Sequence, residues 1–315
     1  MTLAPLLAGG AGRPTISFEL FPARSEAGRD FLCHKVSELV ATRPDFVSVT
    51  FGAAGGTRAP SRELLAHVLS TTAVPAMAHL TCVGLSRREV VDLACEFYDA
   101  GVRDVLALRG DPPTGVGDWA PHPDGVGRAC DLVQLLQVAD RRRLALRGGA
   151  RPVDEGPLSL AVAAFPRGGD GDLAALRAKQ DAGAHFAICQ VTFSADEYAG
   201  FVHRARAAGV TIPLLPGIAV TDDPHRLNRI GELTGVRAPE PLLAALDTDD
   251  AATRRRAAGA FSSGLAAGLL DAGAPGLHLY TFNAATPALD LLDHLALPRT
   301  PAHDQHRDAA VGGLR

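Results

Sequence analysis

Residues 16–25 have the sequence ISFELFPARS, a short apolar strand pattern that leads directly into a polar turn. A doubly wound nucleotide-binding sheet usually carries a glycine-rich phosphate turn after its first strand. Residues 21–25 contain no glycine, so this stretch disfavours that fold. The architecture it favours, for a chain of alternating strands and helices, is the closed (β/α)8 barrel, or TIM barrel.

The rest of the chain repeats this strand pattern. Eight apolar runs predict strands at 16–20, 45–50, 76–82, 104–110, 159–165, 185–193, 212–218 and 276–282. Between these runs, apolar residues recur with the spacing of a helix, most clearly over 86–100, 128–145, 172–182, 196–208 and 251–271. Eight strand–helix units of about 25–45 residues fit one α/β TIM barrel over residues 14–298.

Cap residues support several of these helix boundaries. Ser86 precedes Glu89 by three residues, as in a capping box, and Ser194 is placed to cap the helix that follows the sixth strand. Gly101 and Gly183 follow helical segments, where a glycine accepts the left-handed conformation that ends a helix.

The length of 315 residues permits two domains of roughly 150 residues, but one α/β barrel takes about 250. Hydrophobic residues make up 47% of the chain, which indicates a large core and excludes disorder for most of it. We expect a flexible arm over residues 1–13 and a disordered tail over residues 299–315, because neither has clear periodicity.

Charge and composition exclude several classes of protein. The net charge of −4 argues against a nucleic-acid partner, and no run of about 18 apolar residues predicts a membrane span. The five cysteines are dispersed, which indicates reduced thiols in a cytoplasmic protein and no metal site; they are Cys33, Cys82, Cys95, Cys130 and Cys189. The oligomeric state is left open by the sequence.

In a TIM barrel, side chains at the carboxyl ends of the strands form the active site. Glu19 lies inside the first apolar strand and is expected to face the barrel lumen. Burial favours the protonated carboxyl group, which suits a general acid. The alternative is a structural carboxylate held by a buried arginine or by backbone donors.

Further polar residues mark the ends of other predicted strands. Asp111 follows the fourth strand, directly after Gly110, and a salt-bridged turn is its structural alternative. Gln190 lies among apolar residues of the sixth strand, where a heterocyclic ligand or a neighbouring backbone would satisfy its amide. His79 lies in the third strand, and a lone strand histidine is more often a core group than a catalyst.

Around Glu19, His79, Asp111 and Gln190 the sequence resembles the methylenetetrahydrofolate reductase family. The segments that carry the resemblance are SFELFPAR (17–24), AHLTC (78–82), LALRGDPP (106–113), KQDAGAHFAICQVTF (179–193) and HLYTFN (278–283). They occur in the family's order and cover most of the chain. The family fold is a TIM barrel, in agreement with the strand count.

The resemblance implies reduction of 5,10-methylenetetrahydrofolate to 5-methyltetrahydrofolate by a nicotinamide donor, NADH or NADPH. Glu19 matches the general acid, Asp111 the carboxylate that stabilises positive charge on the folate, and Gln190 the amide that binds the pterin. Thr50 and Tyr280 are assigned with Gln190 to substrate binding. The matches assigned to cofactor binding are His79, Arg109, Gly110, Asp172 and Lys179.

The positions at which most members bind FAD are partly kept and partly lost. The kept positions are Thr50, His79, Arg109, Gly110, Asp111, Asp172 and Lys179, which could also serve folate or the nicotinamide. Phe165 stands where a tyrosine is usual, and the loop that follows is shorter. Ala175 and Ala178 replace polar residues, and Ala284 replaces the arginine that often follows the YTxN motif. These losses are similar to those of a flavin-independent branch, in which hydride passes directly from the nicotinamide to folate.

Three hypotheses follow. We favour a reductase that works without FAD over an ordinary FAD-dependent reductase. The third is a catalytically inactive folate-binding barrel, which the joint presence of Glu19 and Asp111 argues against. The sequence does not distinguish NADH from NADPH.

Overall fold

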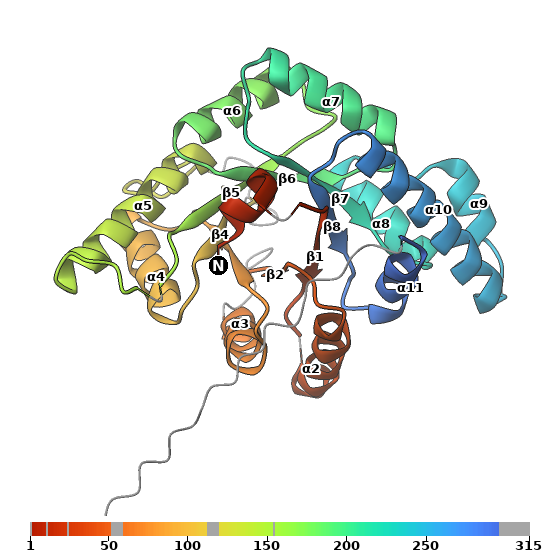
Figure 1. The fold of residues 1–315 in the computed structure, drawn as a ribbon, viewed down its shortest axis with the longest axis horizontal. Helices are drawn as coiled ribbons and strands as arrows, with labels where there is room; N and C mark the ends of the chain where they lie inside the picture. The colour runs from red at the N-terminus through yellow and green to blue at the C-terminus, as the bar shows by residue number, and fades with distance from the viewer. Residues whose placement is uncertain are drawn as a thin grey trace, which may run out of the picture.

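Eight parallel strands close into a barrel in the order of the sequence (Figure 1). This computed structural model describes residues 2–10, 12–23, 25–51, 59–111, 120–153 and 155–295. The strands are β1 (Thr15–Leu20), β2 (Phe46–Val49), β3 (Ala76–Thr81), β4 (Asp104–Leu108), β5 (Ser159–Ala164), β6 (Phe186–Val191), β7 (Leu214–Ala219) and β8 (Gly276–Tyr280). The predicted TIM barrel is confirmed, and each predicted strand is present with ends shifted by at most two residues.

Helices surround the barrel on its outer side (Figure 1). They are α2 (Glu26–Ala41), α3 (Ala59–Thr71), α4 (Arg87–Asp99), α5 (Ala129–Leu146), α6 (Asp170–Asp181), α7 (Ala195–Ala207), α8 (Pro224–Thr234), α9 (Glu240–Leu246), α10 (Ala251–Asp271) and α11 (Ala285–Leu295). No helix in the described part of the chain is long and apolar enough to cross a membrane.

The predicted helix boundaries have the expected caps. Ser86 and Glu89 form the capping box of α4, and Ser194 accepts a hydrogen bond from the backbone N–H of Glu197 at the start of α7. Gly101 and Gly183 follow α4 and α6 with φ of 97° and 106°. The left-handed conformation ends both helices and returns the chain to the next strand.

The N-terminal segment closes the end of the barrel at which the strands begin. It forms α1 (Leu3–Pro5) and a π-helical turn, η1 (Leu6–Gly10), and buries Leu3 and Leu7 in an apolar cluster with Phe46, Met77, Leu106 and Phe186. The structure therefore differs, for residues 2–10, from the flexible arm expected over 1–13, because these leucines fill the barrel floor. Residues 296–315, which include the tail expected to be disordered, lie outside the described residues.

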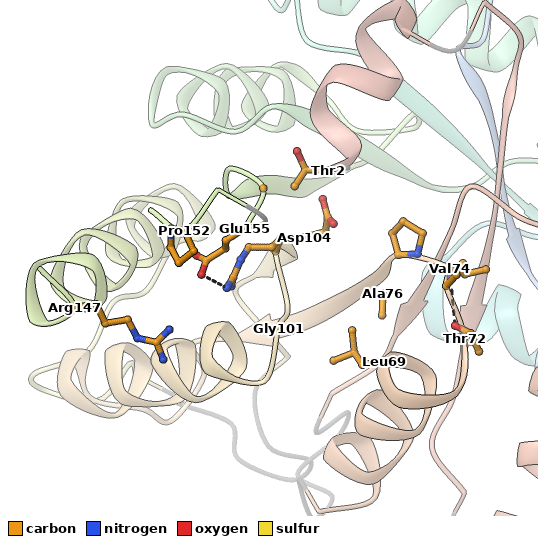
Figure 2. A pocket seen from close by; sticks show the side chains of 14 residues that line it. Thr2, Leu69, Thr72, Val74, Ala76, Gly101, Asp104, Arg147, Pro152 and Glu155 are labelled. Atoms are coloured by element: carbon orange, nitrogen blue, oxygen red, sulfur yellow. Dashed lines mark hydrogen bonds and ion pairs between the residues drawn. The ribbon is translucent and has the colours of Figure 1, made fainter. Parts of the chain in front are cut away.

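A cavity of about 560 Å³ lies beside this N-terminal plug (Figure 2). Thr2, Asp104 and Glu155 line it, and Asp104 accepts a hydrogen bond from the backbone N–H of Leu3 at 3.0 Å. Because Asp104 is the first residue of β4, this cavity opens on the face where the strands begin. The predicted site residues lie at the opposite ends of the strands.

Candidate functional site

Glu19 occupies the carboxyl end of β1 and is 8% exposed. It pairs in register with Ser48 of β2 and Tyr280 of β8. Its carboxylate Oε2 lies 3.7 Å from His278 Nε2 and 3.9 Å from His79 Nε2. Both rings come from strands, so Glu19 points into the barrel, as the strand alternation predicts.

His79 is buried beside Glu19 and is held in its neutral form. Burial lowers the pKa of the imidazole to about 4, although the negative charge of Glu19 opposes this shift. Its Nε2 atom has no hydrogen-bond partner among the described residues. A buried nitrogen without a partner is costly, so this atom is placed to bond a ligand that enters the lumen.

His278 is a member of this group that the sequence did not single out. Its Nδ1 lies 2.8 Å from the hydroxyl of Ser17, and its Nε2 lies 3.5 Å from that of Ser48. The ring is completely buried. Ser17 and Glu19 share one face of β1, and both lie next to His278. The alternation of these two polar residues along β1 was the sequence signal that a polar partner faces them.

Tyr280 completes this side of the lumen. Its ring meets that of His278 edge to face, with centroids 5.3 Å apart, and its hydroxyl donates to the carbonyl of Cys189 at 3.1 Å. Burial, reinforced by the charge of Glu19, raises the pKa of Tyr280 well above its ordinary value. The phenol therefore stays protonated beside Glu19 at neutral pH.

The end of β4 brings Asp111 to the mouth of the barrel. Gly110 has φ of 86°, and a Cβ atom there would lie 2.6 Å from Val83 Cγ1. Only glycine fits this turn without displacing its neighbours. Asp111 is exposed directly after it, and the Nε of Arg109 donates to the Gly110 carbonyl at 3.2 Å.

Gln190 and Thr50 lie at the ends of β6 and β2. The side-chain Oε1 of Gln190 accepts from the backbone N–H of Val191 at 2.9 Å, where the register between β6 and β7 shifts. Within the described part of the chain, its amide nitrogen makes no hydrogen bond, so two donors remain for a ligand. The Thr50 hydroxyl donates to the Leu20 carbonyl at 3.2 Å.

Lys179 and Asp172, both of α6, are engaged locally. Lys179 Nζ donates to the carbonyl of Ala163 at 2.8 Å and lies 5.7 Å from the ring centroid of Phe165. Burial lowers the pKa of this lysine. Asp172 accepts from the backbone N–H of Gly169 at 3.1 Å and caps its own helix. The structure therefore joins Glu19, His79 and Tyr280 in one group, whereas these two residues bond within the β5–α6 region.

The donor set around Glu19 is suited to proton transfer rather than to metal binding. Among the described ranges, no group of three or more histidine, cysteine or acidic side chains is arranged to hold a metal ion. A buried carboxyl group between two imidazole rings is placed to give a proton to a substrate atom in the lumen.

Comparison with known proteins identifies the family. The family model for methylenetetrahydrofolate reductase matches residues 5–296. The chain belongs to the methylenetetrahydrofolate reductase family. The resemblance seen in the sequence motifs is thus confirmed over nearly the whole chain.

Individual relatives agree with this assignment. The 5,10-methylenetetrahydrofolate reductase of Pectobacterium carotovorum is 31% identical over 282 residues, which are 87% of each chain. The Escherichia coli reductase of the same name is also 31% identical and covers 89% of this chain and 90% of its own. A rice relative named probable methylenetetrahydrofolate reductase (NADH) is 31% identical over 92% of this chain, which spans 49% of that protein.

Among solved structures, a Clostridium thermocellum protein described as binding two copies of 5-methyl-5,6,7,8-tetrahydrofolic acid superposes with a TM-score of 0.60. The match covers 92% of this chain and 99% of that one, at 13% sequence identity. At this identity the likeness supports the barrel fold alone.

Proposed function

We propose that this protein reduces 5,10-methylenetetrahydrofolate to 5-methyltetrahydrofolate with NADH or NADPH, and that hydride passes directly to the folate without FAD. The observation that carries the proposal is the buried Glu19 carboxyl group between His79 and His278, in a barrel of the reductase family. The plant relatives named as NADH enzymes support a nicotinamide donor.

The reaction requires one proton and one hydride. The bond between the methylene carbon and N10 breaks, its electron pair stays on N10, and an iminium cation forms at N5. Glu19 supplies the proton that N10 takes up, and C4 of the dihydronicotinamide supplies hydride to the methylene carbon. The folate is reduced to its 5-methyl form and the nicotinamide is oxidised.

The other predicted residues have roles that fit this chemistry. The carboxylate of Asp111, carried by the tight turn at Gly110, stabilises the cation at N5. The amide of Gln190 has two unused donors for the pterin edge, and the unpartnered Nε2 of His79 bonds whichever reactant enters beside Glu19. Thr50, Tyr280 and Arg109 border the same end of the barrel.

The contacts in the β5–α6 region favour a reaction without FAD, although Asp172 and Lys179 match flavin positions of the family. A dinucleotide cofactor needs cations or free backbone donors for its phosphates. Lys179 instead donates to the Ala163 carbonyl and lies over Phe165, while Asp172 occupies the N-terminus of α6 as a helix cap. These local contacts leave fewer groups for the phosphates of FAD in this region, which supports direct transfer between the two substrates.

The test is an assay of the purified protein with methylenetetrahydrofolate and each nicotinamide, with and without added FAD. We expect oxidation of one nicotinamide at a rate that FAD does not change. Glu19→Gln should lower kcat by about 10²- to 10⁴-fold, because the amide cannot donate an acidic proton. Its thermal unfolding should match the wild type, since glutamine has nearly the same shape.

The matched control is Glu63→Gln, which removes an exposed carboxylate on α3 and should leave kcat unchanged. Two results would contradict the proposal: activity that appears only after FAD is added, or full turnover by the Glu19→Gln variant. Absence of turnover by the wild type with both nicotinamides would favour the inactive folate-binding barrel.

A further inference from the structure

His278, in the middle of β8, is completely buried beside the proposed proton donor. Its register partner on β1 is Ser17, and Glu19 lies two residues further along the same strand. The ring reaches both side chains, with Nδ1 2.8 Å from the Ser17 hydroxyl and Nε2 3.7 Å from Glu19 Oε2. One imidazole therefore connects a fixed hydroxyl to the carboxyl group.

The Ser17 hydroxyl decides which nitrogen of His278 carries hydrogen. Ser17 donates its hydrogen to the backbone carbonyl of Leu277 at 3.3 Å. A hydroxyl has only one hydrogen to give, so its oxygen is left to accept from the ring. Nδ1 is therefore the donor toward Ser17, and in a neutral ring Nε2 carries no hydrogen.

This tautomer turns the lone pair of Nε2 toward Glu19. If Glu19 is ionised as well, two electron-rich atoms 3.7 Å apart repel each other in a buried site. One proton between them, on Oε2 or on Nε2, replaces this repulsion by a hydrogen bond, which shortens when substrate closes the site. The contact with Ser17 is kept in both cases, because Nδ1 carries hydrogen in the neutral ring and in the imidazolium ion.

The other side chains that face Glu19 do not share its proton in this way. Burial lowers the pKa of His79 to about 4, so this ring stays neutral. Burial raises the pKa of Tyr280 well above its ordinary value, so the phenol keeps its own proton. The facing residue of β2 is Ser48, which adds no charge. His278 is thus the group on these strands that is placed to share a proton with Glu19.

We propose that His278 is a positioning residue for proton transfer: Ser17 holds its ring with hydrogen on Nδ1, and Nε2 shares one proton with Glu19. The inference rests on the proposed function, in which Glu19 gives a proton to N10 of the folate. In that step the bond from the proton to Glu19 breaks, a bond to N10 forms, and the Glu19–His278 pair is left without its shared proton. Water supplies the next proton after the product leaves.

The pH dependence of kcat/KM in Ser17→Ala tests this role. Without the hydroxyl, a neutral His278 ring moves its hydrogen to Nε2 and donates it to ionised Glu19, so the pair loses its shared proton more easily. The alkaline fall of kcat/KM should begin about one pH unit lower than in the wild type, which corresponds to one hydrogen bond. The plateau on the acid side should stay within about threefold, because Glu19 itself is unchanged.

Two further variants make the test specific. His278→Gln offers an amide N–H to Glu19 but no group that takes up a proton, so its alkaline fall should also begin at lower pH. Ser61→Ala removes a buried hydroxyl of α3 that has no partner among the described residues, and it should leave the profile unchanged. A loss of kcat/KM that is equal at every pH in Ser17→Ala and His278→Gln would show a structural role and overturn the inference.

Nitrogen-15 NMR of the histidine rings tests the pairing without turnover. The His278 signals are assigned as those missing from His278→Gln. In the wild type we expect hydrogen on Nδ1 at every pH at which the protein is folded, and in Ser17→Ala we expect it on Nε2 at alkaline pH. A wild-type Nδ1 without hydrogen would contradict the inference, whether or not the protein reduces methylenetetrahydrofolate. Absence of turnover together with the expected tautomers would contradict the proposed function alone.

Discussion

At the scale of single residues, burial decides the protonation of His79. The Nε2 atoms of His79 and His278 each lie within 4 Å of one carboxylate oxygen of Glu19. The depressed pKa of His79, about 4, keeps it neutral at pH 7, so it bonds a ligand without adding positive charge. This leaves Glu19 as the proton donor in the proposed reaction.

Asp104 gives a residue-scale prediction for pH. Burial raises its pKa from the ordinary 3.8 to about 6. Since the folded pKa lies above the unfolded one, ionisation destabilises the fold as pH rises from about 4 to 6. Asp104→Asn keeps an acceptor for the Leu3 N–H without the charge. We expect the free energy of unfolding of this variant, relative to wild type, to increase by about 2 kcal/mol between pH 4 and 7.

Urea denaturation of both proteins at several pH values measures this difference. Shifts due to other groups, such as His79, are common to both proteins and cancel. Parallel stability profiles over this pH range would show that Asp104 ionises in the fold without penalty.

At the scale of elements, the turn after β4 fixes where Asp111 stands. Gly110→Ala places a Cβ atom 2.6 Å from Val83 Cγ1 in a turn with positive φ. We expect the free energy of unfolding to fall by about 2–4 kcal/mol, from backbone strain and steric overlap together. The kcat should fall about 100-fold, because relief of the overlap displaces Asp111.

Gly84→Ala is the matched control. Gly84 has φ of 70°, but its added Cβ would meet nothing within 4 Å. It should lose only about 1–2 kcal/mol to the left-handed conformation and keep its kcat. Equal losses of stability and activity in the two variants would mean that contact with Val83 is unimportant.

The strands were predictable from the sequence because each is a short apolar run bounded by turn residues. Glu19 was predictable as well, since alternation along β1 decides which way it points. The role of His278 was not, because its partners Ser17 and Ser48 lie 261 and 230 residues away in the chain. The packing of residues 2–10 was missed for a similar reason: Leu3 bonds Asp104, 101 residues distant.

At the scale of the whole molecule, one end of the barrel is closed and the opposite end carries the candidate site. The N-terminal plug closes the end where the strands begin and buries Leu3 and Leu7. The opposite end carries Glu19 and the turn at Asp111. Between β5 and α6, Lys179 and Asp172 make local hydrogen bonds, which supports the proposed direct transfer of hydride.

Transfer of deuterium from nicotinamide to product tests this proposal most directly. The purified protein is given methylenetetrahydrofolate and the preferred nicotinamide, deuterated at C4 on the transferred face, in ordinary water. Direct transfer predicts one deuterium in the methyl group of the product by mass spectrometry. Hydrogen on a reduced flavin exchanges with water, so transfer through FAD would lose the label. A product methyl group without deuterium, formed while the nicotinamide loses its deuterium, would therefore contradict the account.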